Sequence, residues 1–98
     1  MITIIHCYSG VTIEGHANYA EPGKDIVCAA VSTLTQVFIE SVEKLTTDKI
    51  KYAVTEGKAV IAFRNLSEKA QTLLNSFFIG LKMIADEYPE NVQILPKP

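Results

Sequence analysis

The 98-residue sequence predicts an α+β fold, a two-layer sandwich in which two helices pack on one face of a mostly antiparallel sheet. Two pairs of β-rich segments are each joined by a short turn that contains glycine. Two long segments with helical periodicity alternate with these pairs, and the predicted order of elements is ββαββαβ. The length suits one domain over residues 1–98 and leaves no room for a cleft between two lobes.

The four strands of the two hairpins follow from their turns. Ser9-Gly10 and Glu56-Gly57 each separate two runs rich in β-branched and aromatic residues, which is typical of a β-hairpin. The strands expected on this basis are Ile2–Tyr8, Val11–His16, Lys49–Thr55 and Lys58–Arg64.

Two further segments have the spacing of amphipathic helices. The first is Asp25–Leu45; Ser67 is expected to cap a second helix that runs to about Glu87, followed by a last strand over Val92–Leu95. On a wheel of ~100° per residue the first helix should face the sheet with Val27, Leu34, Phe38 and Leu45, with Ala30, Val31 and Ser41 nearby. The second should do so with Ala70, Leu73, Leu74, Phe77, Leu81, Ile84 and Tyr88. Ile39 lies off the first stripe and is expected to line a substrate groove or a dimer contact.

Composition and charge exclude several function classes. The formal net charge is -2 and no stretch concentrates Lys or Arg, so a direct nucleic-acid partner is not expected. No uninterrupted apolar run reaches the roughly 18–20 residues of a membrane span, and the N-terminal residues lack the features of a secretory signal. Two cysteines form no disulfide framework, so we expect a cytoplasmic protein with free thiols and no membrane partner.

One side of the first helix carries polar and thiol groups away from the core stripe. Asp25, Cys28 and Ser32 lie there one above another. Cys28 falls near the start of the helix, where backbone N–H groups lack intrahelical partners and favour negative charge. The thiolate is the nucleophilic form, so Cys28 is a candidate nucleophile, and the same N–H groups could hold an oxyanion. Asp25 is either a helix cap or a group that orients a base.

A nucleophilic cysteine needs a base, and His16 is the better placed histidine. It ends the second strand on its polar side, and the loop Ala17–Lys24 leads directly to the helix that carries Cys28. Gly15 permits a close backbone approach at this point. Spacing alone is equally consistent with a Cys–His dyad and with a buried, satisfied pair.

The remaining cysteine and histidine are assigned to structure. Cys7, in the first strand, is expected to be a structural thiol. A zinc site built from His6, Cys7, His16 and Cys28 would lack the ligand spacings typical of such sites, so no metal and no cofactor are expected.

Gly15-His16-Ala17, followed by Gly23 and then Asp25–Ser32, resembles the bacterial ribosomal-processing cysteine protease family, called Prp. That family's signature is a GH pair, a short loop and a helix that starts with DIVCA-x-x-S. The twelve-residue step from His16 to Cys28 is the same as in the family. The agreement includes Gly15, His16, Asp25, Cys28 and Ser32. Length and element order are similar too, so the resemblance covers essentially the whole domain.

The resemblance implies a cysteine endopeptidase that removes a short N-terminal extension from large-subunit ribosomal protein L-twenty-seven, cleaving after a Phe-Phe pair. Cys28 would be the nucleophile and His16 the general base, supported by Gly15, Asp25 and Ser32. A mobile loop would close over the substrate with Ala17, Asn18, Tyr19 and Gly23. The resemblance also implies a homodimer whose partner is the L-twenty-seven precursor. The alternative from another class is a non-catalytic dimeric interaction module associated with the ribosome.

Overall fold

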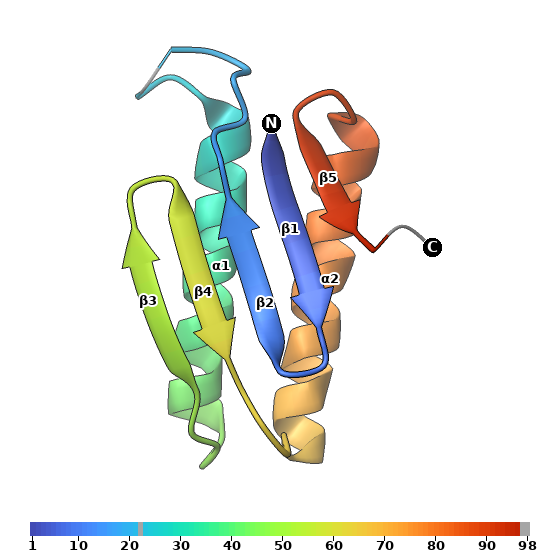
Figure 1. Cartoon of the computed structure of the whole chain (residues 1–98). Helices are drawn as coiled ribbons and strands as arrows, with labels where there is room; N and C mark the ends of the chain where they lie inside the picture. The colour runs from blue at the N-terminus through green and yellow to red at the C-terminus, as the bar shows by residue number, and fades with distance from the viewer. Residues whose placement is uncertain (22, 97–98) are drawn as a thin grey trace.

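The computed structural model describes residues 1–21 and 23–96 and confirms the α+β class with the order ββαββαβ (Figure 1). The strands are β1 (Ile2–Cys7), β2 (Gly10–Glu14), β3 (Lys51–Thr55), β4 (Lys58–Ala62) and β5 (Val92–Leu95). The helices are α1 (Ile26–Leu45) and α2 (Glu68–Glu87). Pro22, in the loop predicted to precede the first helix, lies outside the described residues.

The five strands form one sheet in the order β3-β4-β2-β1-β5. Neighbours pair antiparallel except β1 and β5, which run parallel, so the mostly antiparallel sheet is confirmed. In the β2–β4 register Glu14, the last residue of β2, lies opposite Lys58, the first residue of β4. The chain that leaves β2 therefore passes directly beside the β3–β4 turn.

The second strand ends earlier than the sequence pattern predicts. β2 stops at Glu14, and Gly15 adopts φ +100, which turns the chain out of the sheet. A side chain on Gly15 would overlap the carbonyl oxygen of Met1, so a glycine is required here on two grounds. The prediction that His16 ends a strand is therefore wrong, because His16 is the first residue of the loop that follows.

Both helices cover the same face of the sheet, which leaves the other face open (Figure 1). The buried residues of α1 are Val27, Val31, Thr35, Phe38, Ile39 and Val42. The stripe is centred about 60° from its predicted position, because Leu34 packs sideways against Gly80 of α2 while Val31 and Val42 face the core. Two predictions are therefore wrong: Leu45 is exposed, and Ile39 is a core residue that is only 2% exposed.

The second helix follows its predicted stripe more closely. Ala70, Leu74, Phe77 and Leu81 are buried, whereas Leu73, Ile84 and Tyr88 are half-buried at the border of the core. The ring of Phe77 stacks on that of Phe38 with centroids 4.9 Å apart, which joins the two helices. Among the described residues α1 is the one helix long and apolar enough to span a membrane, but it packs as the core helix of the sandwich.

Candidate active site

The start of α1 is capped by Asp25, which also holds the preceding loop. Its Oδ1 accepts the N–H groups of Val27 and Cys28, each at 3.0 Å. Its Oδ2 accepts the N–H groups of Tyr19 at 3.0 Å and Ala20 at 3.3 Å. One carboxylate therefore ties the loop to the first turn of the helix that carries Cys28.

These four bonds decide between the alternatives left open for Asp25. The N–H of Cys28, followed by those of Ala20, Tyr19 and Val27, lowers the pKa of the carboxyl below its ordinary value of 3.8, against the opposing effect of burial. Within residues 1–21 and 23–96 the side chain bonds backbone N–H groups and not His16, so Asp25 acts as a cap. At the helix start, where we expect N–H groups to hold an oxyanion, the N–H groups of Val27 and Cys28 are therefore already bonded to Asp25.

Cys28 is the third residue of α1 and carries a free, half-buried thiol. The N–H of Ala17 donates to its Sγ at 3.2 Å. Ala17 is only 1% exposed, and the side-chain amide of Asn91 donates to its carbonyl oxygen at 2.9 Å. The sulfur therefore lies against a firmly held backbone donor from the residue that follows His16.

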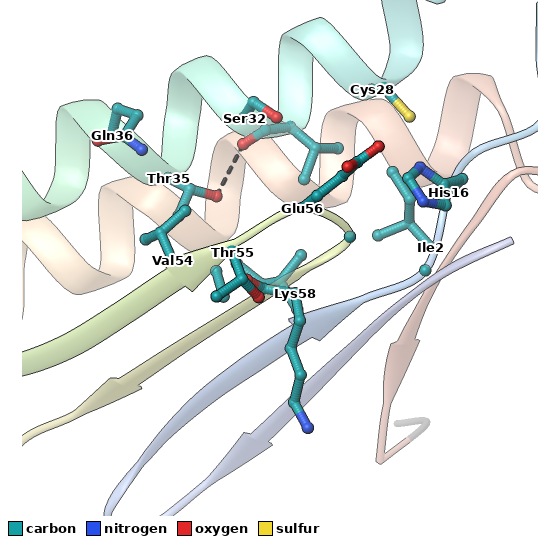
Figure 2. A pocket seen from close by; sticks show the side chains of 15 residues that line it. Ile2, His16, Cys28, Ser32, Thr35, Gln36, Val54, Thr55, Glu56 and Lys58 are labelled. Atoms are coloured by element: carbon teal, nitrogen blue, oxygen red, sulfur yellow. Dashed lines mark hydrogen bonds between the residues drawn. The ribbon is translucent and has the colours of Figure 1, made fainter. Parts of the chain in front are cut away.

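The His16 ring lies against the β3–β4 turn. The N–H of Gly15 donates to the carbonyl oxygen of Gly57 at 2.9 Å, which continues the β2–β4 pairing by one bond. The imidazole then packs on Gly57, whose φ is +74. Cys28, His16 and Glu56 line one groove, and Figure 2 shows their side chains at the same end of it.

A groove of about 310 Å³ separates α1 from the β3–β4 hairpin, a volume within the range of ligand sites, about 300–1,000 Å³. Its walls include Cys28, Ser32 and Thr35 of α1, His16, and Val54 and Glu56 of the hairpin (Figure 2). A second hollow lies beyond the sulfur and is lined in part by Asn18, Gly23 and Lys24. The two hollows share His16, Cys28, Ser32 and Glu56. The sulfur and the imidazole therefore stand where the two hollows meet.

The remaining residues of the predicted site have different positions. Ser32 is exposed and lines both hollows, whereas the buried Thr35 donates its hydroxyl to the carbonyl oxygen of Val31 at 2.8 Å. Tyr19 packs edge-on against Tyr88 with centroids 5.2 Å apart and lines neither hollow. Tyr19 therefore does not face the groove in this structure.

Sequence reasoning missed three residues near the sulfur. Glu56 and Gly57 were identified only as a hairpin turn, because their proximity to His16 depends on the pairing of β2 with β4. Asn91 belongs to no motif, and it reaches Ala17 across 74 positions of the chain.

The second thiol and the second imidazole lie elsewhere. Cys7 and His6 are near the β1–β2 turn, whereas His16 follows the opposite end of that hairpin, so the four ligand-type residues do not come together. Cys7 is exposed, and its Sγ donates to the carbonyl oxygen of Gly10 at 3.4 Å, so its structural role stays a prediction. His6 stacks on Phe78 of α2 with centroids 4.3 Å apart.

Comparison with known proteins shows one consistent likeness. Residues 1–93 match the family model described as cysteine protease Prp. A ribosomal processing cysteine protease Prp from Mycoplasma genitalium is 35% identical over 98 aligned residues, which cover 96% of this chain and 94% of the relative. The protein of that name from Staphylococcus aureus is 28% identical over 87 residues, covering 86% and 82% respectively.

Solved structures show the same likeness. An essential ribosomal processing protease Prp from S. aureus, in complex with a covalently linked product peptide, matches with a TM-score of 0.88 at 28% identity, over 96% of this chain and 97% of that one. The S. aureus protease in complex with a substrate peptide matches with a TM-score of 0.80 at 25% identity, over 95% and 94%.

Proposed function

The chain belongs to the Prp family of ribosomal-processing cysteine proteases, and on that premise we propose that it is an endopeptidase with Cys28 as nucleophile and His16 as general base. The observation that carries this proposal is the position of the Cys28 sulfur. It lies at the junction of two hollows that His16 also lines, and 3.2 Å from the backbone nitrogen of Ala17.

The proposed reaction has two stages. His16 accepts the Cys28 proton, and the thiolate attacks the scissile carbonyl carbon to form a C–S bond. The imidazolium then donates its proton to the leaving amine as the C–N bond breaks, which leaves a thioester on Cys28. His16 next accepts a proton from water, whose oxygen attacks the thioester. The C–S bond then breaks, the imidazolium returns its proton to the sulfur, and the carboxylic acid product leaves and releases its own proton to solvent.

The substrate that we propose is a precursor of ribosomal protein L-twenty-seven with a short N-terminal extension that ends in a Phe-Phe pair. The two hollows offer room on both sides of the sulfur, as an extended peptide crossing an endopeptidase site requires. Val54 lines the first of them, is 45% exposed and offers apolar contact to aromatic side chains. The family's named role in ribosomal processing supports a ribosomal-protein substrate.

The proposal extends to the cellular setting. A ribosomal-protein precursor is met where ribosomes are assembled, so we place the enzyme in the cytoplasm. The resemblance to the family also supports a homodimer, which sedimentation of the purified chain would test directly.

Incubation with synthetic precursor peptides tests the function. A peptide that spans the Phe-Phe junction should yield two products whose masses, measured by mass spectrometry, place the break after the second Phe. A matched peptide with Ala-Ala at the junction should be cleaved far more slowly. Binding of the first peptide without any product would overturn the proposal in favour of the non-catalytic interaction module.

A further inference from the structure

Asn91 joins the connection between α2 and β5 to the loop beside the sulfur. Its Nδ2 donates to the carbonyl oxygen of Ala17 at 2.9 Å. Its own backbone is held at both ends, because its N–H donates to Tyr88 at 2.9 Å and its carbonyl oxygen accepts the N–H of Ile2 at 2.8 Å. The Asn91 side chain is half-buried, and these two backbone hydrogen bonds fix the position of the backbone that carries it.

The residue that Asn91 holds is the one that donates to the nucleophile. The N–H of Ala17 lies 3.2 Å from the Cys28 sulfur. A hydrogen bond to an ionised acceptor is stronger than one to its neutral form, so this contact strengthens as negative charge develops on the sulfur during attack. The N–H groups of Val27 and Cys28 cannot replace it, since Asp25 already accepts both.

We infer that Asn91 is a positioning residue of the active site, which holds Ala17 so that its N–H points at the Cys28 sulfur. The catalytic meaning of this inference rests on the proposed function, but the contact itself belongs to the free protein. Without the amide, Ala17 loses the bond on its carbonyl side, and small shifts of a group beside the nucleophile cost rate.

The test measures thiol reactivity and turnover in the same variants. A Cys7→Ser background leaves Cys28 as the one thiol of the 98-residue chain, so that iodoacetamide uptake reports Cys28 alone. Asn91→Ala removes the amide, and Asn91→Asp keeps its size but places an oxygen against the Ala17 carbonyl. Gln93→Ala is the matched control, because Gln93 uses its amide on Thr3 at 3.1 Å, in β5 and outside the groove.

Both Asn91 variants should lower the alkylation rate of Cys28 and kcat for a precursor peptide by about tenfold or more, with a smaller change in KM. Gln93→Ala should keep wild-type rates in both assays. Wild-type rates in a folded Asn91 variant, with only the melting temperature lowered, would overturn the inference. If Asn91→Ala does not fold, the size-matched Asn91→Asp decides.

The two assays also separate this inference from the proposed function. Alkylation needs no substrate, so it reports on Asn91 even if the wild-type protein cleaves no precursor peptide. In that event the proposed function fails, while a slower alkylation of the Asn91 variants still supports the positioning role.

Discussion

Nε2 of His16 lies 3.0 Å from the point where a Cβ atom on Gly57 would stand. The imidazole can pack this closely on the turn because Gly57 has no side chain. The contact depends on the β2–β4 pairing, which brings the end of β2 beside the β3–β4 turn. It makes the hairpin a wall of the groove that Cys28 and His16 line.

Gly57→Ala should therefore displace the His16 ring. A contact of 3.0 Å is tighter than Cβ atoms ordinarily make, so the ring or the turn has to shift by a few tenths of an ångström. We expect kcat/KM for the precursor peptide to fall about tenfold or more, together with a loss of stability of about 1–2 kcal/mol for alanine at positive φ. Steady-state kinetics and thermal melting measure the two effects.

Gly23→Ala is the control for backbone strain in the melting experiment. Gly23 has φ +85, yet an added Cβ would meet no atom within 4 Å. The two alanine variants should lose similar stability. Full retention of kcat/KM by Gly57→Ala would contradict the placement of the imidazole on this turn.

Cys28→Ala should abolish cleavage and leave the fold intact, because it removes the nucleophile from a half-buried position at little packing cost. Cys28→Ser should also be nearly inactive, since a hydroxyl is a much weaker nucleophile at neutral pH. Product formation by mass spectrometry and the circular dichroism spectrum provide the two readouts. Cleavage by Cys28→Ala would rule out this nucleophile.

The two thiols offer a comparison within one molecule. Cys7 is exposed and Cys28 is half-buried, so access alone favours alkylation of Cys7. We expect iodoacetamide to modify Cys28 faster, because the Ala17 N–H contacts its sulfur and the imidazole that shares its groove is the proposed acceptor of its proton. Peptide mapping after timed quenching measures both rates, and a faster Cys7 would count against activation of Cys28.

Asp25→Asn should lower stability in a pH-dependent way. The N–H of Cys28 and three others hold the pKa of Asp25 below 3.8, so ionised Asp25 stabilises the fold above that pH. This contribution is lost as the pH falls through the lower folded pKa. The melting temperatures of wild type and Asp25→Asn should therefore differ at pH 7 and converge below pH 3.8. A difference that stays constant with pH would contradict the carboxylate's role.

Asp48→Asn is the matched control for that variant. Bonds from the Ser67 hydroxyl and N–H at the start of α2 likewise lower the pKa of Asp48. Asp48 lines neither of the hollows beside the sulfur. Asp48→Asn should therefore lose stability with kcat/KM unchanged, whereas Asp25→Asn should lose both, because it releases the loop beside Cys28.

Ile39 and Leu45 test the observed orientation of α1. Ile39→Ala should cost about 2–5 kcal/mol, the range for a large aliphatic side chain removed from a core. Leu45→Ala should stay within about 0.5 kcal/mol, because Leu45 is 62% exposed. Urea denaturation measures both losses of stability. A larger loss for Leu45→Ala than for Ile39→Ala would support the buried face of α1 expected from the sequence pattern.

The turn signals and the two periodicities were enough to predict the fold class and the order of elements. Hairpin turns and helix caps act over a few residues, so Ser9-Gly10, Glu56-Gly57 and Ser67 carry their information locally. The wheel for α1 placed Cys28 beside the core correctly but centred the stripe wrongly. A helix that packs on a sheet and on a second helix has a wide apolar arc, and the pattern alone does not show which part of the arc faces the sheet.

By itself the sequence determined which chemistry is available, with Cys28 at a helix start and a short loop from His16 to Asp25 that keeps the imidazole near the thiol. Only the tertiary structure decided what surrounds that pair. The order β3-β4-β2-β1-β5 brings Gly57 to the imidazole, and the α2–β5 connection brings Asn91 to Ala17. The physical reason is that neighbours along the chain are constrained by covalent geometry and local hydrogen bonds. Contacts between distant segments depend instead on how the whole core packs.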